Sequence, residues 1–467
     1  MSSLEGLPRE ILAEIPLHLH DDPALEGREI FREKHKVRGL NWRKYLMSLR
    51  AVNRMFRDLV NPLLFEHVTI FSGRPLKINH VPDLRSRHNR RWVFKEIGVS
   101  RLERLSMDPS IRKLVRRLEF ADMPLDDLYA YLADPDKETN NGVFDVENLR
   151  YVARISILIH SVLPRFPNLT ALRLDFAEIP YRPSGVFGPR NFDHDGTPYW
   201  VQDTADLFRS FSTAICRSGL DKLEELDLSL PIAHDFGHFL KNGNEDECSL
   251  TRVLFEQLKR LAVDVVQRND ISGRSFRLNQ WNTVYAKNVQ ELLPLAPNLH
   301  HLRVRSKCFL SLTASSLPHS NLRLLELHYL RIAGEALTSV IERCQSLQWV
   351  HMDRIRIESG TWEDILTVMR KTSITSIDLF DCGYWNSDSR QNLYPHTQNY
   401  IHTNRVGDLK ACELTFTQLH ENMCRIYGSN YGEHLIRGHK APDQIAAEFR
   451  KLLEESSTDM DSPETGR

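Results

Sequence analysis

The sequence predicts an α/β fold in which a small all-α domain precedes a solenoid of strand–helix repeats. Three observations predict it. Two amphipathic helical segments lie within the first 65 residues, and short leucine-patterned strands recur from about residue 110 onward. Amphipathic helical stretches separate the later strands. In such a solenoid the strands form a parallel sheet on the concave face and the helices cover the convex face.

Composition and charge exclude several classes of protein. Of the 467 residues, 41% are hydrophobic, which suffices for a large core. The 61 Lys and Arg residues balance 62 Asp and Glu residues, so no global field attracts nucleic acid or an anionic membrane. The first 30 residues show no apolar secretory core. The most apolar stretch, 155–163, is too short to cross a bilayer.

Cysteine usage indicates a reducing compartment. The seven cysteines are an odd number, lie far apart and contain no C-x-x-C pair. A disulfide framework or a zinc site is therefore not expected, and the histidines show no metal-ligand spacing. We expect a cytoplasmic and/or nuclear protein without cofactor or metal.

The repeated strands carry the prediction of the solenoid. Each matches apolar-x-x-apolar-x-apolar, and the last four begin 23, 25 and 27 residues apart, with helical stretches at 334–346 and 361–373. A strand plus a helix every 20 to 29 residues is typical of a leucine-rich repeat, whose leucines are buried only when neighbours stack. The strands begin at Leu114, Leu169, Leu223, Leu299, Leu322, Leu347 and Ile374.

The predicted repeat array is irregular in its first half. Gaps of 54 and 76 residues separate the strands that begin at Leu169, Leu223 and Leu299, and the number of regular repeats between 175 and 298 stays open. A single parallel sheet with alternating helices there would support the solenoid, whereas a separate globular domain would contradict it. The expected domains are a helical domain at 1–72 with a loop inserted near 20–41, a basic linker at 73–110, a solenoid at 111–436 with loops near 179–200, 231–249 and 382–400, and a helix with a polar tail at 437–467.

The N-terminal helices have a distinctive pattern. Leu7, Ile11, Leu12 and Ile15 share one helical face, and Pro8 suits a first helical turn. A second helical stretch follows with apolar residues at helical spacing, which Pro62 is expected to end before a short strand. This stretch contains Leu46, Leu49, Val52, Phe56, Leu59 and Val60.

These residues resemble an F-box, in the form common before leucine-rich repeats. The resemblance rests on Leu7-Pro8 with its apolar stripe and on the stretch from Leu49 to Leu59, which reads L-R-x-V-N-R-x-F-R-x-L. About 20 extra residues near 20–41 depart from the pattern. The resemblance implies a small helical trimer that docks on the Skp adaptor of a cullin–RING ubiquitin ligase. Its implied adaptor-binding residues are Leu7, Pro8, Ile11, Leu12, Ile15, Leu49, Val52, Phe56 and Leu59. The alternative is a helical hairpin that caps the solenoid.

The repeat pattern also predicts a binding surface. Residues between the leucines point to the exposed concave sheet, where Trp349, Leu324 and Phe380 offer an apolar patch beside charges, as in an interface hot spot. A C-terminal helix or the 382–400 loop covering this patch is an equal alternative. The candidate substrate-binding residues are Arg173, Glu225, Asp227, His301, Arg303, Arg305, Leu324, Glu326, His328, Trp349, His351, Asp353, Asp378 and Phe380.

Two other motifs are weaker. Asp193-His194-Asp195-Gly196-Thr197 looks like a phosphatase nucleophile loop, but loop-forming residues precede it where a buried strand is required, so we expect no catalysis. The stretch 85–117 is basic with Trp92 and Phe94 interleaved. It fits either an acidic or nucleic-acid partner or, as we favour, a solvated face.

The sequence as a whole favours a non-catalytic substrate-recognition subunit. By its resemblance, the chain binds the Skp adaptor, and through it a cullin–RING ligase, and presents a protein substrate for ubiquitination by proximity. The alternative is a leucine-rich scaffold outside the ubiquitin pathway. No membrane or nucleic-acid partner is expected, and the substrate and any need for its phosphorylation stay open.

Overall fold

The computed structural model divides the chain into two compact units. The N-terminal unit comprises Met1–Arg173 and Ser218–Lys222, and the C-terminal unit comprises Leu174–Arg217 and Leu223–Arg467. The structure describes residues 41–71, 74–77, 92–95, 97–121, 158–175, 199–230, 233–240, 245–265, 286–385, 401, 403, 405–428 and 440–460. The predicted boundaries at 72, 110 and 436 stay predictions.

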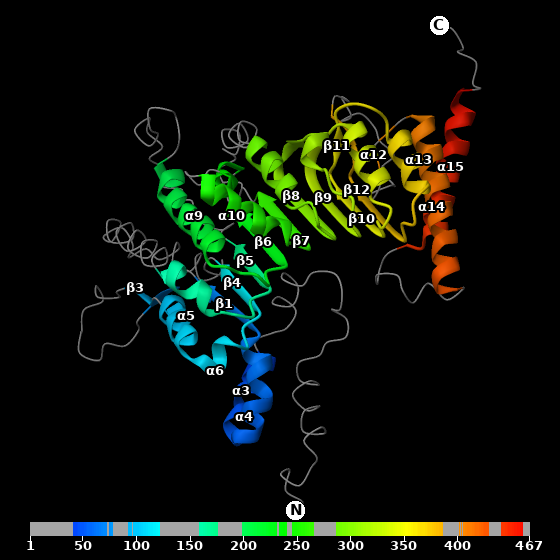
Figure 1. Ribbon diagram of the computed structural model, residues 1–467. Helices are drawn as coiled ribbons and strands as arrows, with labels where there is room; N and C mark the ends of the chain where they lie inside the picture. Colours follow the sequence, from blue (N-terminus) through cyan, green and yellow to red (C-terminus); the bar gives the residue numbers. More distant parts are fainter. Residues whose placement is uncertain are drawn as a thin grey trace, which may run out of the picture. The chain divides into compact units, whose positions relative to one another are not determined.

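Two helices begin the described part of the N-terminal unit. The stretch expected as one helix is α3 (Asn41–Val52) and α4 (Arg54–Phe65) (Figure 1). The break is at Asn53, whose extended backbone lets its side chain accept a hydrogen bond from the N–H of Phe56 at 2.9 Å. Asparagine is a preferred N-cap because this bond satisfies a free amide of the first turn.

Helix α4 continues past Pro62, which corrects the expectation that this proline ends it. Proline removes one helical hydrogen bond and costs about 3 kcal/mol. Packing outweighs that cost, because Leu64 is buried with Leu46 and Val60 in one apolar cluster. The carbonyl of Pro62 still accepts a hydrogen bond, from the N–H of Glu66 at 2.9 Å.

A small parallel sheet follows in the N-terminal unit. Strand β1 pairs in parallel with β4, in a register that joins His67 to Arg117, and β5 lies next to β4. The segment expected as a basic linker also contains regular structure, namely an antiparallel strand pair and two helices. The bounds are β1 (His67–Phe71), β2 (Arg74–Lys77), β3 (Trp92–Lys95), α5 (Ile97–Met107), α6 (Pro109–Arg112), β4 (Arg117–Ala121) and β5 (Ala171–Asp175).

The C-terminal unit is a mixed α/β, solenoid-like structure with a parallel sheet. Its main strands pair in parallel in chain order. Of two further short strands, one pairs in parallel with the last two residues of β9 and with the other short strand. The main strands are β6 (Glu225–Leu230), β7 (Arg260–Val265), β8 (His301–Leu312), β9 (Leu324–Ile332), β10 (Trp349–Asp353) and β12 (Ser376–Phe380); the short ones are β11 (Arg356–Ile357) and β13 (Gly383–Tyr384).

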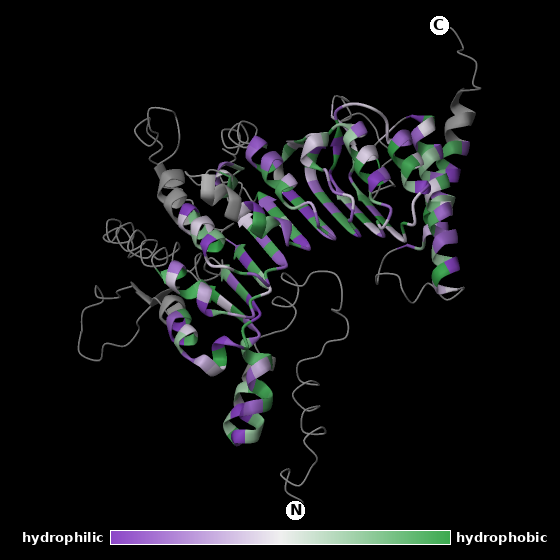
Figure 2. Ribbon diagram, viewed as in Figure 1, coloured by the Kyte–Doolittle hydropathy of each residue, from purple (hydrophilic) through white to green (hydrophobic). Residues whose placement is uncertain are grey.

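Helices lie along one side of this sheet (Figure 1). The hydropathy of the residues largely alternates along the strands (Figure 2). The apolar residues of one face, among them Leu325, Leu327, Val350 and Met352, are buried. The helices are α9 (Tyr199–Arg217), the 3₁₀ helix η6 (Ala233–Phe239), α10 (Glu245–Glu256), α12 (Gly334–Arg343) and α13 (Trp362–Arg370). The expected loop at 231–249 therefore contains η6 and the start of α10.

Strand β7 was not expected, and it fills the 76-residue gap. Its sequence has the repeat pattern, with Leu258, Leu261 and Val263 at the apolar positions, and all three are buried. It pairs in parallel with β6 and β8. In the described part of 199–298, helices thus alternate with strands of a single parallel sheet, as the solenoid prediction requires.

Three residues with positive φ mark the same place in successive repeats. Tyr329, Arg354 and Asp381 have φ of 54°, 54° and 48°. Each is the fifth residue after one of three register-matched residues, Leu324, Trp349 and Ser376. Left-handed backbone is uncommon outside glycine, so its recurrence at one offset is a structural repeat in its own right.

Two helices close the C-terminal unit. Helix α14 (Val406–Tyr427) was not expected, whereas α15 (Pro442–Met460) covers the expected C-terminal helix. The rings of Phe416 and Phe449 stack between them, with centroids 6.1 Å apart. None of the described helices combines the length and apolar character needed to cross a membrane.

Candidate protein-interaction surfaces

The strand register brings the predicted substrate-binding residues of the C-terminal unit onto one face of its sheet. We call this face, made by alternate residues of β6 to β10 and β12, the polar sheet face. It forms three rows across the strands. The rows are Glu225, Arg260, His301, Leu324, Trp349 and Ser376; then Asp227, Ala262, Arg303, Glu326, His351 and Asp378; then Ser229, Asp264, Arg305, His328, Asp353 and Phe380.

Sequence reasoning missed Arg260, Ala262 and Asp264, because it missed β7. The signal was present in the apolar spacing of Leu258, Leu261 and Val263. The missed residues matter for the site, because Asp264 is fully buried and pairs with Arg303.

Two of the predicted residues of this face are buried, which corrects the expectation that they are exposed. Arg303 and Asp227 expose 3% and 2% of their surface. Their side chains join at 3.0 Å, and Arg303 Nε lies 3.5 Å from Asp264 Oδ1. Neighbouring strands are about 4.8 Å apart, close enough for charged side chains to neutralise each other along a row. These residues therefore hold adjacent strands together and present little surface to a partner.

Arg173 lies in the N-terminal unit and is likewise buried. Its guanidinium pairs with Glu119 of β4 at 3.4 Å. The same carboxylate accepts a hydrogen bond from Thr69 of β1 at 3.0 Å. Arg173 thus stabilises the small sheet of its own unit and is not exposed as predicted.

The later strands keep accessible side chains on the polar sheet face. Trp349 and Leu324 are register partners and both are half-buried, as is Phe380 on β12. The apolar patch expected from the sequence is therefore formed only in part, because Leu324 and Trp349 are neighbours in the first row whereas Phe380 lies in the third row opposite Asp353. The accessible predicted residues of this part are Leu324, Glu326, His328, Trp349, His351, Asp353, Asp378 and Phe380.

Three histidine–carboxylate pairs cross the face beside that patch. His301 lies 2.9 Å from Glu326, His328 lies 3.5 Å from Asp353, and His351 lies 2.7 Å from Asp378. The first member of each pair comes from one strand and the second from the next. The face consequently offers a partner alternating hydrogen-bond donors and acceptors and no uniform charge.

The surroundings of these three histidines shift their pKa values in different directions. Burial lowers the pKa of His301 and of His328, and their carboxylate partners only partly oppose it. Burial also disfavours the charged form of His351, but the hydrogen bond to Asp378 and the nearby acidic charges outweigh it and raise the pKa. The rings of His328 and His351 are 4.7 Å apart in a tilted arrangement, so two neighbouring imidazoles have pKa values shifted in opposite directions.

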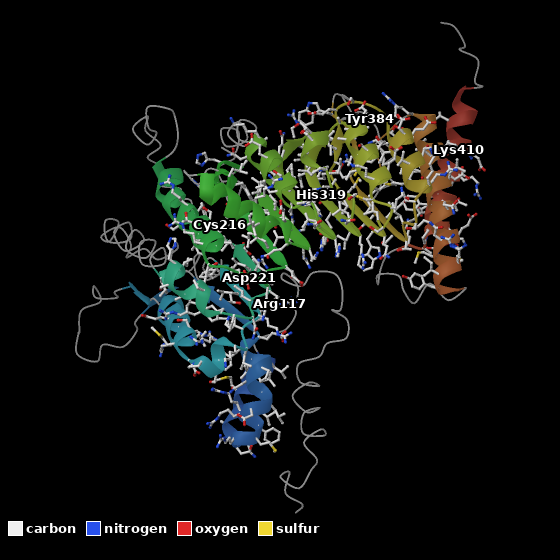
Figure 3. All side chains as sticks on the ribbon, in the orientation of Figure 1. Arg117, Cys216, Asp221, His319, Tyr384 and Lys410 are labelled. Atoms are coloured by element: carbon white, nitrogen blue, oxygen red, sulfur yellow. The ribbon has the colours of Figure 1, made fainter. Side chains whose placement is uncertain are left out.

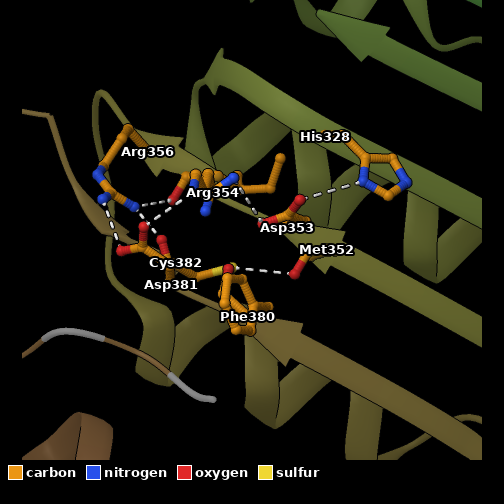
Figure 4. A network of polar contacts seen from close by, with 9 residues as sticks. His328, Met352, Asp353, Arg354, Arg356, Phe380, Asp381 and Cys382 are labelled. Carbon is orange, nitrogen blue, oxygen red and sulfur yellow. Dashed lines mark hydrogen bonds and ion pairs between the residues drawn. The ribbon is translucent and has the colours of Figure 1, made fainter. Parts of the chain in front are cut away.

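A second cluster lies where the strands of these repeats end, and sequence reasoning missed it. We call it the rim cluster. Arg354 lies with its guanidinium 4.5 Å above the ring of Tyr329. Its Nε is 3.1 Å from Asp381 (Figure 4). Arg356 contacts the other oxygen of Asp381 at 2.9 Å. The cluster comprises Tyr329, Arg331, Arg354, Arg356, Asp381 and Trp385.

The rim cluster has a sequence signal. The stretches H-Y-L-R-I, D-R-I-R-I and F-D-C-G-Y begin at 328, 353 and 380, and their third residues are the buried Leu330, Ile355 and Cys382. Burial raises the pKa of the Cys382 thiol to about 12, so it is an inert core residue. Trp385 is 40% exposed under Arg331, whose guanidinium lies 4.4 Å from its ring.

The predicted adaptor-binding set is only partly within the described residues. Leu7, Pro8, Ile11, Leu12 and Ile15 lie outside them. Phe56 is buried in the chain's own fold, which removes it from a contact surface. Leu49 and Leu59 are half-buried, whereas Val52 is 63% exposed. Met47, which the sequence did not single out, is also exposed on α3.

The structure adds little on the two weaker motifs, the string at 193–197 and the basic stretch at 85–117. The 193–197 string lies outside the described residues. Of the basic stretch, Trp92 and Phe94 belong to β3. In the part of the chain that the structure describes, one group of three potential metal ligands gathers, formed by His234, Asp235 and His238 on η6.

Comparison with known proteins adds a distant structural likeness. No protein-family model matches the chain, and no curated protein matches it. A solved structure of the complex of Rad7 and Elc1 in yeast is similar at 15% sequence identity, with 80% of this chain and 82% of that chain covered and a TM-score of 0.28. A TM-score of this size is too low to assign a fold or a partner.

Proposed function

We propose that the chain is the substrate-recognition subunit of a Skp–cullin–F-box ubiquitin ligase in the cytoplasm and/or nucleus. In this proposal the N-terminal helices are an F-box that binds the Skp adaptor. The strands of the C-terminal unit are leucine-rich repeats whose polar sheet face binds a protein substrate. The chain performs no bond chemistry and contributes proximity, by holding a substrate lysine near the ubiquitin-loaded partner.

The observation that carries this proposal is the repeat geometry of the C-terminal unit. Its strands pair in parallel in chain order, and Tyr329, Arg354 and Asp381 take the same left-handed conformation at one offset. Such an array supports a repeat protein, whose extended face is suited to binding another protein. The L-R-x-V-N-R-x-F-R-x-L stretch before it supports the F-box assignment.

The described F-box helices provide a testable contact. Val52 and Met47 are 63% and 48% exposed on α3, although both are large apolar side chains. Exposed apolar groups of this kind are common at protein interfaces. In the proposal they meet the adaptor, together with Leu49 and Leu59.

The test measures binding of the purified full-length chain to purified Skp adaptor, followed by addition of the cullin. The variant is the double substitution Met47→Glu and Val52→Glu. A matched control is Val253→Glu on α10, because Val253 is also 63% exposed but lies in the C-terminal unit. Burying an unpaired carboxylate at an interface costs several kcal/mol, so the variant should bind at least about tenfold more weakly.

Three outcomes decide the proposal. Binding by wild type and control but not by the variant supports it. Equal binding by the variant means that α3 is not the adaptor contact and overturns the F-box assignment of this helix. No adaptor binding by wild type leaves the alternative of a repeat scaffold outside the ubiquitin pathway.

A further inference from the structure

The 3₁₀ helix η6 gathers two imidazoles and a carboxylate. His234, Asp235 and His238 each offer one ligand atom, and these atoms all lie within 4.8 Å of one another. His234 Nδ1 is 3.6 Å from Asp235 Oδ1. In a tetrahedral zinc site with bonds of about 2.0–2.2 Å, ligand atoms lie about 3.4 Å apart. One of the three separations is therefore already near that of a metal site.

Aromatic packing and a hydrogen bond fix the turn that carries these side chains. Ala233, Phe236 and Phe239 of η6 are buried, and Phe239 packs edge-on against Phe255 of α10 at 6.5 Å between centroids. Asn288 donates a hydrogen bond from Nδ2 to the carbonyl of His234 at 3.2 Å. A preorganised backbone lowers the cost of bringing three ligands onto one ion.

A close approach at Gly237 fixes the same turn. A Cβ added there would lie 2.7 Å from the amide nitrogen of the buried Asn288, so the position accepts only glycine without a shift. Glycine thus lets the turn between Asp235 and His238 lie directly on Asn288.

We propose that His234, Asp235 and His238 form a binding site for a divalent first-row transition metal ion such as Zn²⁺. Two imidazoles and one carboxylate are the donor set that such ions prefer over Mg²⁺ or Ca²⁺, which take oxygen ligands. Asp235 is 1% exposed and His234 is 29% exposed, so the ion sits at the edge of the core with access from solvent. Three protein ligands leave a further coordination position for water or an outside group.

The site also has a sequence signal, H-D-x-x-H, within the stretch expected as the 231–249 loop, and sequence reasoning overlooked it when it found no metal-ligand spacing among the histidines. The proposal concerns binding of the ion and is independent of the adaptor and of the polar sheet face. A bound ion would fix η6 against α10 and Asn288, and would raise the melting temperature of the chain by mass action.

The test titrates Co²⁺ into the metal-free full-length chain and follows the visible absorption of the ion, with Zn²⁺ and Mg²⁺ as competitors. The variants are Asp235→Asn and His238→Gln, with His300→Gln as a control histidine outside the cluster. The more exposed His234→Gln is a third variant in case a substitution at the buried Asp235 prevents folding, which circular dichroism of the metal-free protein will show.

We expect one Co²⁺ per wild-type or control chain, displaced by Zn²⁺ and not by Mg²⁺. Loss of a second-shell partner alone costs about 10–100-fold in affinity, so loss of a ligand should cost more than about 100-fold. Zn²⁺ should raise the melting temperature of wild type and not of the ligand variants. Equal binding by wild type and folded variants, or no binding by wild type, would show that the three side chains are only a hydrogen-bonded cluster and would overturn the proposal.

Discussion

Arg303 of β8 reaches across β7 to Asp227 of β6, with 3.0 Å between Nη2 and Oδ2. The residue between them in the row is Ala262. Its small methyl side chain leaves space for the guanidinium to pass over β7. The contact therefore involves β6, β7 and β8 together. It acts as a clamp, because it holds the three strands in register in the interior of the sheet.

The clamp predicts an order of destabilisation. Arg303→Met leaves the buried Asp227 and Asp264 without their guanidinium and should lower the free energy of unfolding by about 3–5 kcal/mol. Asp227→Asn should cost less, because Asp264 still neutralises Arg303. Urea unfolding curves measure both. The half-buried Arg305 on the same strand provides the control, Arg305→Met, and a similar loss for this control would contradict the clamp.

His319 predicts an acid sensitivity. It is fully buried (labelled in Figure 3), and burial, reinforced by the charge of Arg343, lowers its pKa to about 4 against an opposing effect of two backbone carbonyls. A lowered histidine pKa means stability that is present above the unfolded value of about 6.5 and is lost as the pH falls toward 4. The loss is at most about 3 kcal/mol.

Substitution of His319 should flatten this pH dependence. His319→Leu and His319→Gln both remove the titrating group, so both should show a smaller decrease in melting temperature between pH 7 and pH 4.5 than wild type. A profile as steep as that of wild type in either variant would mean that another group causes the acid sensitivity.

The neighbouring residues His328 and His351 should titrate separately. Because Asp378 and nearby acids raise the pKa of His351 while burial lowers that of His328, His351 should protonate at higher pH. The His351–Asp378 pair stabilises the fold below the unfolded pKa of about 6.5, and this contribution is lost as the pH rises through the folded value. Imidazole NMR signals followed against pH measure both.

Asp378→Asn should lower the pKa of His351, because the charge that favours its protonated form is removed. Asp353→Asn is the matched control: it should lower the pKa of the neighbouring His328 and act less on His351. Unchanged titration of His351 in Asp378→Asn would contradict the role of this contact.

We expect Trp349 to lie at the centre of the surface through which the polar sheet face binds a partner. Trp349→Ala should weaken binding of a substrate by at least about 30-fold, as for a central tryptophan of an interface, while adaptor binding stays unchanged. Quantitative proteomics of co-purified proteins, with Val253→Ala as control, measures it. A partner that still co-purifies with Trp349→Ala but no longer with Val253→Ala would show that the binding surface lies elsewhere on the chain.

Local sequence pattern predicted the other main strands of the sheet, although not β7, and the face that they share, because alternation and apolar spacing are local properties. It did not predict the burial of Asp227 and Arg303, since that depends on Ala262 in a strand hidden by irregular spacing. Nor did it predict that α4 continues past Pro62, because the packing of Leu64 on Leu46 is tertiary. The rim cluster was missed for a similar reason, since its residues meet only when three strand ends are brought side by side.

The left-handed residues Tyr329, Arg354 and Asp381 have a consequence for how the surface can change. The backbone geometry at this offset is the same whether the side chain is an aromatic, a base or an acid. The backbone at this offset therefore accepts different side-chain chemistry in each repeat. A substitution there changes what a partner meets, and at Arg354 or Asp381 it also removes an ion pair between neighbouring repeats.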